Sequence, residues 1–476
     1  MRKHTKIVAT VSDIRCEVDF VKKLYKAGMD VVRMNTAHVD FEGLERVINN
    51  VRQVSEKIAL LMDTKGPEIR TTRCDNDIVL EMGDIVYIKG EPTGKSDKEV
   101  ICVSYPNIAE DVGINSHLLF DDGEIDLVVR DVTNGMLKCE VLNNGTLGSK
   151  KSVNIPGVRI NLPSLTERDI EFIKFGIEKD IDFIAHSFVR NADDVKAIQK
   201  ILDEHDSPIK IIAKIENQEG VENIDEILEN VYGVMVARGD LAIEIGQEKI
   251  PLVQRQLIRK CVEAKKPVIV ATQMLHSMIK HPRPTRAEVT DIANAIYYRT
   301  DAIMLSGETA YGKYPVEAVA TMASIAKEVE PAKDARNDIP VDLVKNDITA
   351  YLADTAVKAS KELPIKAVLT DSLTGKTARY LAAFRGAQPV VALCYNKRVG
   401  RELALSYGVF PRLTEPGSSK GEIMRKTVDK LKKKEILDDN DLVTYLGGSF
   451  GIGGGTTYLE IITVKGLVNK IDRYNE

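Results

Sequence analysis

The chain has 476 residues and a formal net charge of −5, with 43% hydrophobic and 29% charged residues. That length indicates about two or three domains, while the charge excludes the basic surface typical of nucleic-acid binding. No apolar run approaches the roughly 20 residues of a membrane span, and scattered cysteines without a CxxC pair indicate reduced thiols in a cytoplasmic protein.

Short runs of β-branched residues recur along the chain, and amphipathic helical patterns separate them. Apolar strands that alternate with helices indicate a parallel sheet covered on both faces. Eight such units predict an α/β fold, a closed (β/α)8 TIM barrel, although an open doubly wound sheet is the alternative. The expected strands are residues 6–10, 30–37, 58–65, 183–188, 210–216, 233–240, 267–272 and 302–308.

A long segment separates the third and fourth expected strands, where a loop normally needs only about 2–6 residues. It contains alternating apolar and polar residues with Asp-Gly and Asn-Gly pairs, which are typical of β-hairpins. We therefore expect residues 71–161 to form a small inserted β-barrel domain, which would cover the mouth of the main barrel as a lid.

The strand and helix pattern restarts after about residue 340, behind the polar stretch "PAKDARNDIPVD". The runs "AVLT", "PVVALC" and "DLVTYLG" predict further parallel strands. We expect residues 340–476 to form a C-terminal α/β regulatory domain, and residues 1–70 and 162–339 to form the catalytic barrel.

Charged and polar residues of both signs follow the expected barrel strands, where catalytic groups of such barrels lie. Buried charges must pair with one another or act on a ligand, because an unpaired one is costly. Ion pairs that close the barrel mouth are the structural alternative, but contributions from so many strands favour a site. The residues are Arg33, Asn35, Asp63, Lys65, Ser187, Lys214, Glu216, Arg238, Asp240, Thr272 and Glu308.

Lys214 and Glu216 alternate onto one face of a strand, and Glu216 and Asp240 are expected to end adjacent strands. Two carboxylates suit Mg²⁺, and the ammonium of Lys214 suits charge that develops on a substrate oxygen. Gly239 lets backbone amides approach an anion, and Thr272 adds a hydroxyl, for which a helix cap is the alternative. These residues predict a Mg²⁺-dependent barrel enzyme acting on a small anionic substrate.

A series of motifs, in this order, resembles the pyruvate kinase family. The family's reaction is phosphoryl transfer from phosphoenolpyruvate to ADP, a step of glycolysis that gives pyruvate and ATP. The resemblance implies Mg²⁺, with Mn²⁺ as an alternative, together with K⁺, and it implies a homotetramer. The motifs are "ATVSD", "RMNTAH", "MDTKGPEIRT", "AKIENQEG", "VMVARGDLAIEI", "ATQML", "PTRAEVTDIANA" and "DAIMLSGETAYGKYPVEAV".

The resemblance also implies residue roles. Arg33 would contact the transferring phosphoryl group with help from Arg70, and Lys214 would neutralise charge on the phosphoryl group and the enolate oxygen. Amides around Gly239 and Asp240 would hold the substrate carboxylate, and the enolate would be protonated near Thr272. The implied Mg²⁺ ligands are Glu216 and Asp240. The implied K⁺ ligands are Asn35, Asp63 and the backbone of Thr64, and the implied nucleotide-binding residues are Asn35, His38 and Arg70.

The chain departs from the family at a few positions. Ala37 replaces a serine whose hydroxyl ligates K⁺, and alternation points Thr36 to the other face. Glu68, however, is the residue that accompanies K⁺ dependence, so we expect a weakened but retained K⁺ requirement. His276 is expected at a surface or subunit contact, and Arg299 has no functional interpretation.

The C-terminal domain contains "SLTGKTAR", which is similar to the family's effector loop. Hydroxyls, a glycine and a cation at a helix start could hold a phosphate, and an ordinary helix cap is the alternative. We expect a phosphorylated effector, either a sugar phosphate or a nucleotide, with the stretch 447–458 as a facing loop. The loop residues are Ser372, Thr374, Gly375, Lys376 and Thr377.

Two other functions remain open from the residues. A Mg²⁺-dependent carbon–carbon lyase would use the same lysine and carboxylates, but it would not need the inserted lid or the nucleotide-side residues Arg33, Asn35 and His38. A barrel that only senses a metabolite is the second alternative. Ala37 is the one hint toward it, and the intact set of Lys214 with its carboxylates argues against it.

Overall fold

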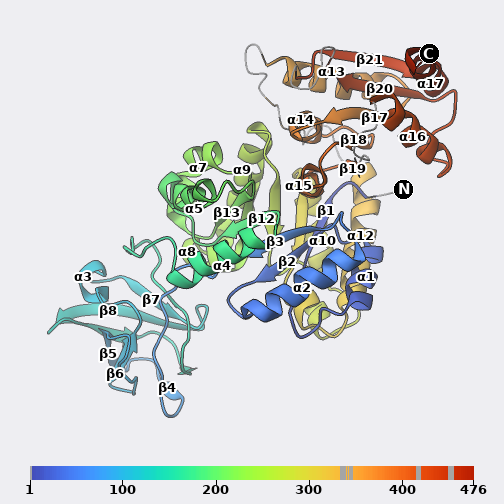
Figure 1. Ribbon diagram of the computed structural model, residues 1–476. Coiled ribbons are helices and arrows are strands. Elements are labelled where there is room, and N and C mark those ends of the chain that lie inside the picture. Colours follow the sequence, from blue (N-terminus) through green and yellow to red (C-terminus); the bar gives the residue numbers. More distant parts are fainter. Residues whose placement is uncertain are drawn as a thin grey trace.

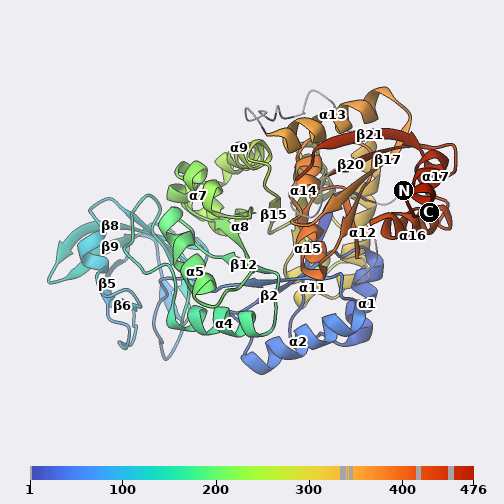
Figure 2. The same cartoon turned by 45° about the horizontal axis from the view of Figure 1, so that its top comes forward.

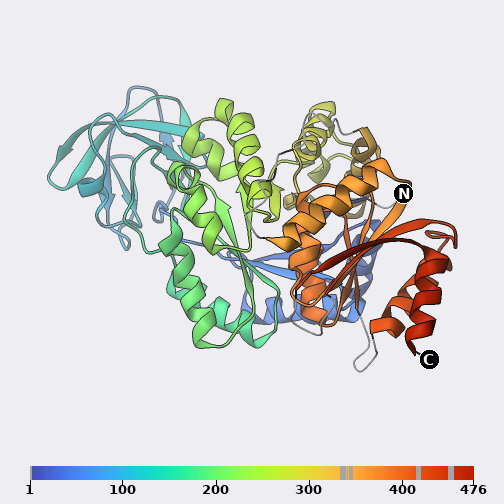
Figure 3. The ribbon, with the colours of Figure 1, turned by 90° about the horizontal axis from the view of Figure 1, so that it is seen from above.

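The computed structural model describes residues 3–332, 339, 341, 347–413, 420–448 and 455–475. Three bodies follow one another in space (Figure 1): an inserted β-domain, a central barrel, and a C-terminal domain at the opposite end of the barrel. Figure 3, the view from above, shows the same separation of the two outer bodies. Within the described ranges, no helix is long and apolar enough to cross a membrane.

The central body is a closed barrel of eight parallel strands, in the order β1-β16-β15-β14-β13-β12-β3-β2. This confirms the (β/α)8 TIM barrel and excludes the open sheet. Most residues of these strands are apolar and buried, because both faces of the sheet are covered. Their bounds are β1 Lys6–Thr10, β2 Val31–Asn35, β3 Ala59–Asp63, β12 Phe183–His186, β13 Lys210–Ile215, β14 Gly233–Ala237, β15 Val268–Ala271 and β16 Ala302–Leu305.

Helices cover the outside of the barrel and bury their apolar faces against the strands (Figure 2). Two of them begin with a capping box, in which Thr166 pairs with Asp169 and Thr285 pairs with Glu288. The helices are α1 Val18–Ala27, α2 Phe41–Val54, α4 Glu167–Glu178, α5 Ala192–Glu204, α6 Gln218–Glu222, α7 Ile224–Asn230, α8 Arg238–Ile245, α9 Ile250–Glu263, α10 Arg286–Tyr297, α11 Gly307–Ala310 and α12 Pro315–Val329, with the 3-10 turns η1 Gln247–Lys249, η2 His276–Ile279 and η3 Glu330–Ala332.

Several strands end earlier than expected. The expected strand 233–240 ends at Ala237, and Arg238 opens α8. Arg238 Nη1 lies 2.7 Å from Asp291 Oδ2, so the side chain points toward α10. The expectation that Asp240 ends a strand is therefore wrong: Asp240 lies in the first turn of a helix.

The inserted segment has its own core, in which Phe120, Leu127 and Ile88 are buried. The predicted turns form: Asp122-Gly123 joins β7 to β8, and Asn134-Gly135 joins β8 to β9, with positive φ at all four residues. One sheet has the order β11-β7-β8-β9-β5-β6 and the other is β10-β4. The elements are β4 Ile78–Leu80, β5 Ile85–Gly90, β6 Val100–Val103, α3 Ile108–Asp111, β7 His117–Phe120, β8 Ile125–Thr133, β9 Met136–Val141, β10 Gly145–Leu147 and β11 Val153–Asn154.

The C-terminal body is a sheet in the order β19-β18-β17-β20-β21, flanked by helices. The expected strands are parallel, and β21 adds an antiparallel edge to β20. The elements are α13 Ile348–Glu362, β17 Ile365–Ser372, α14 Lys376–Ala383, β18 Val390–Cys394, α15 Lys397–Glu402, η5 Leu403–Leu405, β19 Val409–Leu413, α16 Lys420–Lys432, β20 Leu442–Gly447, β21 Tyr458–Thr463 and α17 Val464–Asn475.

The C-terminal body closes the bottom of the barrel. Leu405 of η5 is buried with the side chains that fill the barrel interior. Arg401 pairs with Asp182 at 2.5 Å, and Arg385 pairs with Asp301 at 2.7 Å. Both aspartates directly precede barrel strands, so this body sits at the amino ends of the strands. The opposite end is left for the site, as in other (β/α)8 enzymes.

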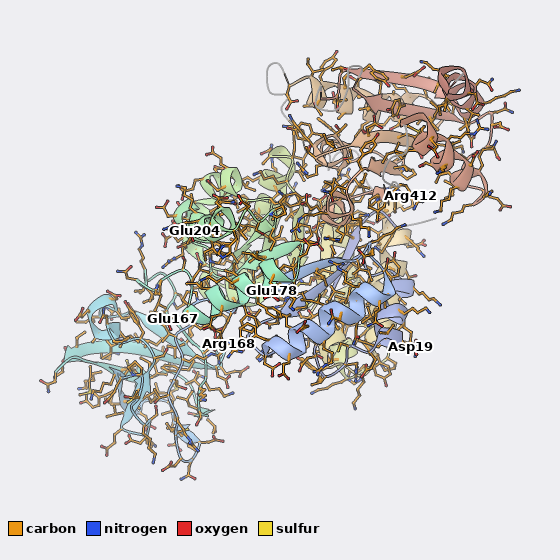
Figure 4. The ribbon with its side chains drawn as sticks, viewed as in Figure 1. Asp19, Glu167, Arg168, Glu178, Glu204 and Arg412 are labelled. Carbon is orange, nitrogen blue, oxygen red and sulfur yellow. The ribbon has the colours of Figure 1, made fainter. Side chains whose placement is uncertain are left out.

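Figure 4 labels side chains that lie toward the two ends of the barrel. Glu167 and Arg168 begin α4 on the side that faces the inserted domain, whereas Arg412 lies in the C-terminal body. The first turn of α4 directly follows the inserted segment, so the chain re-enters the barrel at its carboxyl-end face.

Candidate active site

Lys214 stands at the centre of a charge cluster at the carboxyl ends of the strands. Its Nζ lies 3.0 Å from Glu216 Oε1 and 3.1 Å from Asp63 Oδ1. It also donates a hydrogen bond to Ser187 Oγ at 2.7 Å. The strand order explains the cluster, because β13 is hydrogen-bonded to β12, and β12 to β3. The same-face prediction for Lys214 and Glu216 agrees with this contact.

Arg33 brings a second cation to the same cluster. Its Nε donates to Asp63 Oδ2 at 2.6 Å, and its Nη1 donates to Thr10 Oγ1 at 3.1 Å. Asp63 thus receives Arg33 on one carboxylate oxygen and Lys214 on the other. Burial alone would raise the pKa of Asp63, but the two cations outweigh it and hold the pKa below its ordinary value. Asp63 therefore holds both cations next to each other in the site.

The protonation state of Lys214 follows from its neighbours. Burial alone would lower the pKa of Lys214, but the carboxylates of Asp63 and Glu216 outweigh burial and raise the pKa above its ordinary value. Lys214 therefore stays an ammonium at neutral pH. It can stabilise an anion, whereas a free amine base would require the opposite shift.

Glu216 and Asp240 form a pair of crowded carboxyl groups beside Lys214. Burial raises the pKa of Glu216 to about 7, with Asp240 adding to the effect, and burial also raises the pKa of Asp240. Two like charges in a buried place are unfavourable unless a cation lies between them. The donor set therefore fits a divalent cation, and Mg²⁺ commonly takes one or two protein carboxylates.

Thr272 and Gly239 form the adjoining wall. Gly239 is the second residue of α8, and its amide donates to Thr272 Oγ1 at 2.9 Å. The Thr272 hydroxyl donates in turn to Ala271 O at 2.7 Å, and the residue has φ 69°. A β-branched residue with positive φ is an outlier that commonly marks a functional site. Because the Thr272 hydroxyl accepts from an amide in the first turn of α8, the helix-cap alternative remains open beside a role in the site.

Two charged residues of the expected cluster have structural partners instead. Arg238 is buried and donates to both carboxylate oxygens of Asp291, at 2.8 and 2.7 Å. Glu308 is buried in α11, where it accepts from the amides of Leu275 and Ser306. For these two residues the ion-pair and hydrogen-bond alternative is correct, and neither joins the Lys214 cluster.

Of the expected nucleotide-binding residues, His38 is exposed after β2. Lys65, a member of the expected strand-end set, is half-buried after β3. Arg70 donates to Glu68 Oε2 at 2.7 Å and to the carbonyl of Lys150, in the inserted domain, at 2.8 Å. In this conformation Arg70 ties the strand leaving the barrel to the inserted domain, and it makes no contact with Lys214 or Arg33 among the described residues.

Comparison with known proteins assigns the family. The family model described as "Pyruvate kinase, barrel domain" matches residues 2–319, and that described as "Pyruvate kinase, alpha/beta domain" matches residues 351–462. A protein named pyruvate kinase from Borreliella burgdorferi is 45% identical over 473 residues, 98% of each chain. Another of that name, from Bacillus licheniformis, is 44% identical over 99% of this chain and 82% of its own. The chain belongs to the pyruvate kinase family. The resemblance noted in the motifs is confirmed, and the chain is a transferase.

The expected K⁺ ligands of this pyruvate kinase family member lie on neighbouring strands. Asn35 and Asp63 are register partners of β2 and β3. Asn35 Oδ1 accepts from the amide of Ala37 at 3.1 Å, and the hydroxyl of Thr36 donates to the carbonyl of Asp63 at 2.9 Å. The amide oxygen of Asn35 and the carboxylate oxygens of Asp63, at the ends of these two strands, suit a monovalent cation. Ala37 supplies no side-chain oxygen, and the Thr36 hydroxyl is already engaged.

The expected effector residues extend from Ser372 at the end of β17 to Lys376 and Thr377 at the start of α14. Ser372 is 2% exposed, and among the described residues its Oγ has no hydrogen-bond partner. Gly375 has φ 79°, which a residue with a side chain rarely adopts. Lys376 Nζ lies 3.5 Å from Asp347 Oδ2, and the side chain of Thr374 is exposed.

Part of the expected facing loop reaches this place. The Oγ1 atoms of Thr377 and Thr456 are 2.6 Å apart, so the stretch 447–458 approaches the loop. Residues 449–454 of that stretch lie outside the described residues. Among the described residues, the buried Ser372 hydroxyl near the start of α14 has no hydrogen-bond partner. Such a free hydroxyl is consistent with a bound ligand, whereas a simple helix cap would not require it.

Two positions without a predicted role have plain structural settings. His276 is exposed on η2, in agreement with a surface position. Arg299 is buried with φ 75°, and its carbonyl accepts from Arg385 of the C-terminal body at 2.5 Å. Arg299 therefore belongs to the joint between the barrel and the C-terminal body.

Residues after β12 shape the site, although no specific role was predicted for them. The amide of Phe188 donates to Glu216 Oε2 at 2.7 Å, and Phe188 itself has φ 55°. Ser187 Oγ also donates to the carbonyl of Thr64 at 2.6 Å. Gly66 leaves room for this turn, because a Cβ there would lie 2.8 Å from Ser187 Cβ. The available sequence signals were the polar Ser187 at a strand end and the glycine in "DTKGP".

Proposed function

We propose that this chain transfers the phosphoryl group of phosphoenolpyruvate to ADP and so forms pyruvate and ATP in glycolysis. The observation that carries the proposal is the ammonium of Lys214, held within 3.1 Å of two carboxylates at the mouth of a barrel that matches the pyruvate kinase family. The alternative lyase and sensor functions would give no ATP from these substrates, so the formation of ATP tests the proposal.

Phosphoryl transfer depends mainly on positioning and charge stabilisation, and the cluster can supply both. Lys214 and Arg33 are two cations fixed by Asp63, which leaves them oriented before substrate binds. Arg33 would contact the transferring phosphoryl group, and Lys214 would stabilise charge on that group and on the enolate oxygen. The amides at Gly239 and Asp240 would hold the substrate carboxylate.

Formation of pyruvate also requires a proton on the carbon of the enolate. The Thr272 hydroxyl hydrogen-bonds to the amide of Gly239 and to the carbonyl of Ala271, which fixes it next to the proposed carboxylate position. We propose that the enolate is protonated in the region of Thr272. The backbone strain at this residue supports a functional role.

Glu216 and Asp240 would hold Mg²⁺, or Mn²⁺ in its place. When bound, the divalent cation supplies charge neutralisation for the oxygens of the substrate. The raised pKa values of the two carboxyl groups support this assignment. The chain itself contributes the buried pocket that keeps these carboxylates next to Lys214.

Each of the three domains would have a separate role. We propose that residues 1–70 and 162–339 form the catalytic barrel, residues 71–161 a lid, and residues 340–476 a regulatory domain. Closure of the lid would exclude water, which would otherwise consume the phosphoryl group. Arg70, which now contacts Glu68 and the lid carbonyl of Lys150, could turn to the phosphoryl group on closure. Asn35, His38 and Arg70 would contact the nucleotide.

A K⁺ requirement that is weakened but retained is proposed for the site at Asn35, Asp63 and the backbone of Thr64. Replacing Ala37 with serine restores one oxygen, and we expect it to lower the K⁺ concentration for half-maximal activity about tenfold, the effect of about 1.4 kcal/mol. The measurement is activity against added KCl in a K⁺-free buffer.

The exposed Ala264 at the end of α9 provides the matched control, because Ala264→Ser adds the same hydroxyl far from the site. It should leave the K⁺ response unchanged. Full activity of the unmodified protein without K⁺ would refute a retained requirement, and an A37S protein with an unaltered K⁺ response would refute the assigned position.

An allosteric effector that carries phosphate is proposed for Ser372, Thr374, Gly375, Lys376 and Thr377. A sugar phosphate or a nucleotide should lower the phosphoenolpyruvate concentration for half-maximal rate, and Lys376→Met should shift the effector concentration at least about tenfold higher, because a charge-assisted hydrogen bond is lost. Lys358→Met is the control, since Lys358 is an exposed lysine of α13 paired with Asp354. If neither a sugar phosphate nor a nucleotide changes the titration of activity with phosphoenolpyruvate, the assignment is contradicted.

The assembly and location follow from the family only. We propose a homotetramer in the cytoplasm that has no nucleic-acid or membrane partner. The free thiols, all of them buried in the described structure, are consistent with a reducing compartment.

A further inference from the structure

The turn that follows β15 has an unusual backbone for the residues in it. Thr272 has φ 69° and Gln273 has φ 54°, so two successive residues with side chains lie in the left-handed region. Such a conformation costs free energy and persists only where neighbouring groups hold it. The groups that hold this turn therefore decide where the Thr272 hydroxyl lies.

Arg238 holds the turn from the neighbouring strand. β14 pairs with β15 so that Ala237 lies opposite Ala271, and Arg238 comes next in the chain. Its Nε donates to the carbonyl of Ala271 at 3.2 Å, and its Nη2 donates to the carbonyl of Thr272 at 2.5 Å. One guanidinium thus binds both peptide groups that flank the Cα atom of Thr272, and the orientations of these two groups set its φ and ψ.

The guanidinium is itself fixed on its other side. Arg238 Nη1 donates to Asp291 Oδ1 at 2.8 Å and to Oδ2 at 2.7 Å, in α10, and to Gln254 Oε1 at 3.4 Å, in α9. The rigid fork of donors in arginine can make all these contacts at once. The compact ammonium of a lysine cannot hold Asp291 and both carbonyls in the same geometry, so Lys at this position would release part of the turn.

The side chain of Thr272 is held by the same segment. Its Oγ1 accepts from the amide of Gly239 at 2.9 Å and donates to the carbonyl of Ala271 at 2.7 Å. That carbonyl is also the acceptor for Arg238 Nε. A shift of the guanidinium would therefore move the backbone of Thr272 and the acceptor of its hydroxyl together.

We propose that Arg238 is a positioning residue for protonation of the enolate, because it holds the strained turn that places the Thr272 hydroxyl. The inference rests on the proposed function, in which the enolate is protonated in the region of Thr272. Among the described residues, Arg238 forms no hydrogen bond or ion pair with Lys214 or Arg33. It therefore acts on proton transfer more strongly than on phosphoryl transfer.

Exchange of pyruvate protons with solvent isolates the proton transfer. In D2O, pyruvate gives up a methyl proton to form the enolate, and the enolate takes a deuteron at the same carbon, so no phosphoryl group moves. Proton NMR of the methyl signal measures this exchange with Mg²⁺, K⁺ and inorganic phosphate present. Arg238→Lys should slow exchange at least about tenfold more than it slows ATP formation from phosphoenolpyruvate and ADP, because hydrogen bonds from a charged group are lost.

Two comparisons separate positioning from a general fold defect. Arg52→Lys is the matched control, because Arg52 also donates to a carbonyl, that of Ile58, and to a carboxylate, that of Asp182, at the amino ends of the strands. It should leave the ratio of exchange to ATP formation unchanged. In Thr272→Ala, which already lacks the hydroxyl, the addition of Arg238→Lys should slow exchange no further.

Equal losses of exchange and of ATP formation in R238K, or a further loss of exchange in the double variant, would overturn the proposal. An unmodified protein that makes ATP but exchanges no pyruvate protons overturns this inference alone, whereas one that makes no ATP refutes the proposed function as well. If R238K fails to fold, Asp291→Asn decides, because it removes the anchoring charge at a side chain that is 34% exposed. Its loss of exchange should exceed its loss of ATP formation, and equal losses overturn the proposal.

Discussion

Replacing Lys214 with methionine is expected to lower kcat for ATP formation by about 10³-fold, the scale seen when a charge-stabilising group is removed from an acyl- or phosphoryl-transfer site. Methionine keeps the length of the side chain and removes only its charge. The loss should fall on kcat, because Lys214 is proposed to act mainly on charge that develops in the transition state. Steady-state kinetics with phosphoenolpyruvate and ADP measure it.

A fold defect would also lower the rate, so the variant needs a structural control. Lys210→Met changes the lysine that begins the same strand, β13, at the other end of the barrel. It should keep kcat within about twofold, as is typical of a substitution away from the reacting atoms. An unchanged kcat in K214M, or an equal loss in both variants, would contradict the role assigned to Lys214.

Replacing Glu216 with glutamine is expected to weaken the binding of Mn²⁺, used as a probe for Mg²⁺, by about 100-fold, since even indirect partners of a metal contribute 10–100-fold. Glutamine keeps the shape and the hydrogen bond from the Phe188 amide but removes the charge. Electron paramagnetic resonance of free Mn²⁺ measures the affinity in the absence of substrate, and so separates metal binding from catalysis.

Glu222→Gln is the matched control, because Glu222 is an exposed glutamate later in the same segment, at the end of α6. Its Mn²⁺ affinity should equal that of the unmodified protein. Equal affinity in E216Q and E222Q would show that the cation lies elsewhere, and Asp240 would then have no partner carboxylate for the assigned metal.

Local sequence rules were enough for much of the fold. Parallel strands buried on both faces are mostly apolar and β-branched, so "KIIAKIE" and its counterparts were recognisable as barrel strands. Asp122-Gly123 and Asn134-Gly135 form the predicted hairpin turns because both residues of each pair must adopt positive φ. Alternation along β13 likewise placed Lys214 and Glu216 on one face, where they meet at 3.0 Å.

Features that depend on distant partners could not be read from local patterns. Asp240 lies in a helix because Arg238 turns away to Asp291, more than fifty residues later in the chain. Ser187 gains its role only when β12 comes between β3 and β13. Arg299 accepts a left-handed conformation because Arg385, from another domain, binds its carbonyl.

The most direct test of the central claim is ATP formation from phosphoenolpyruvate and ADP by the purified protein, with Mg²⁺ and K⁺ present. Luciferase luminescence reports ATP, and lactate dehydrogenase with NADH reports pyruvate in a parallel sample. We expect both products in equal amounts and neither of them when ADP is left out. Pyruvate without ATP, or no product at all, would contradict phosphoryl transfer to ADP as the function of this chain.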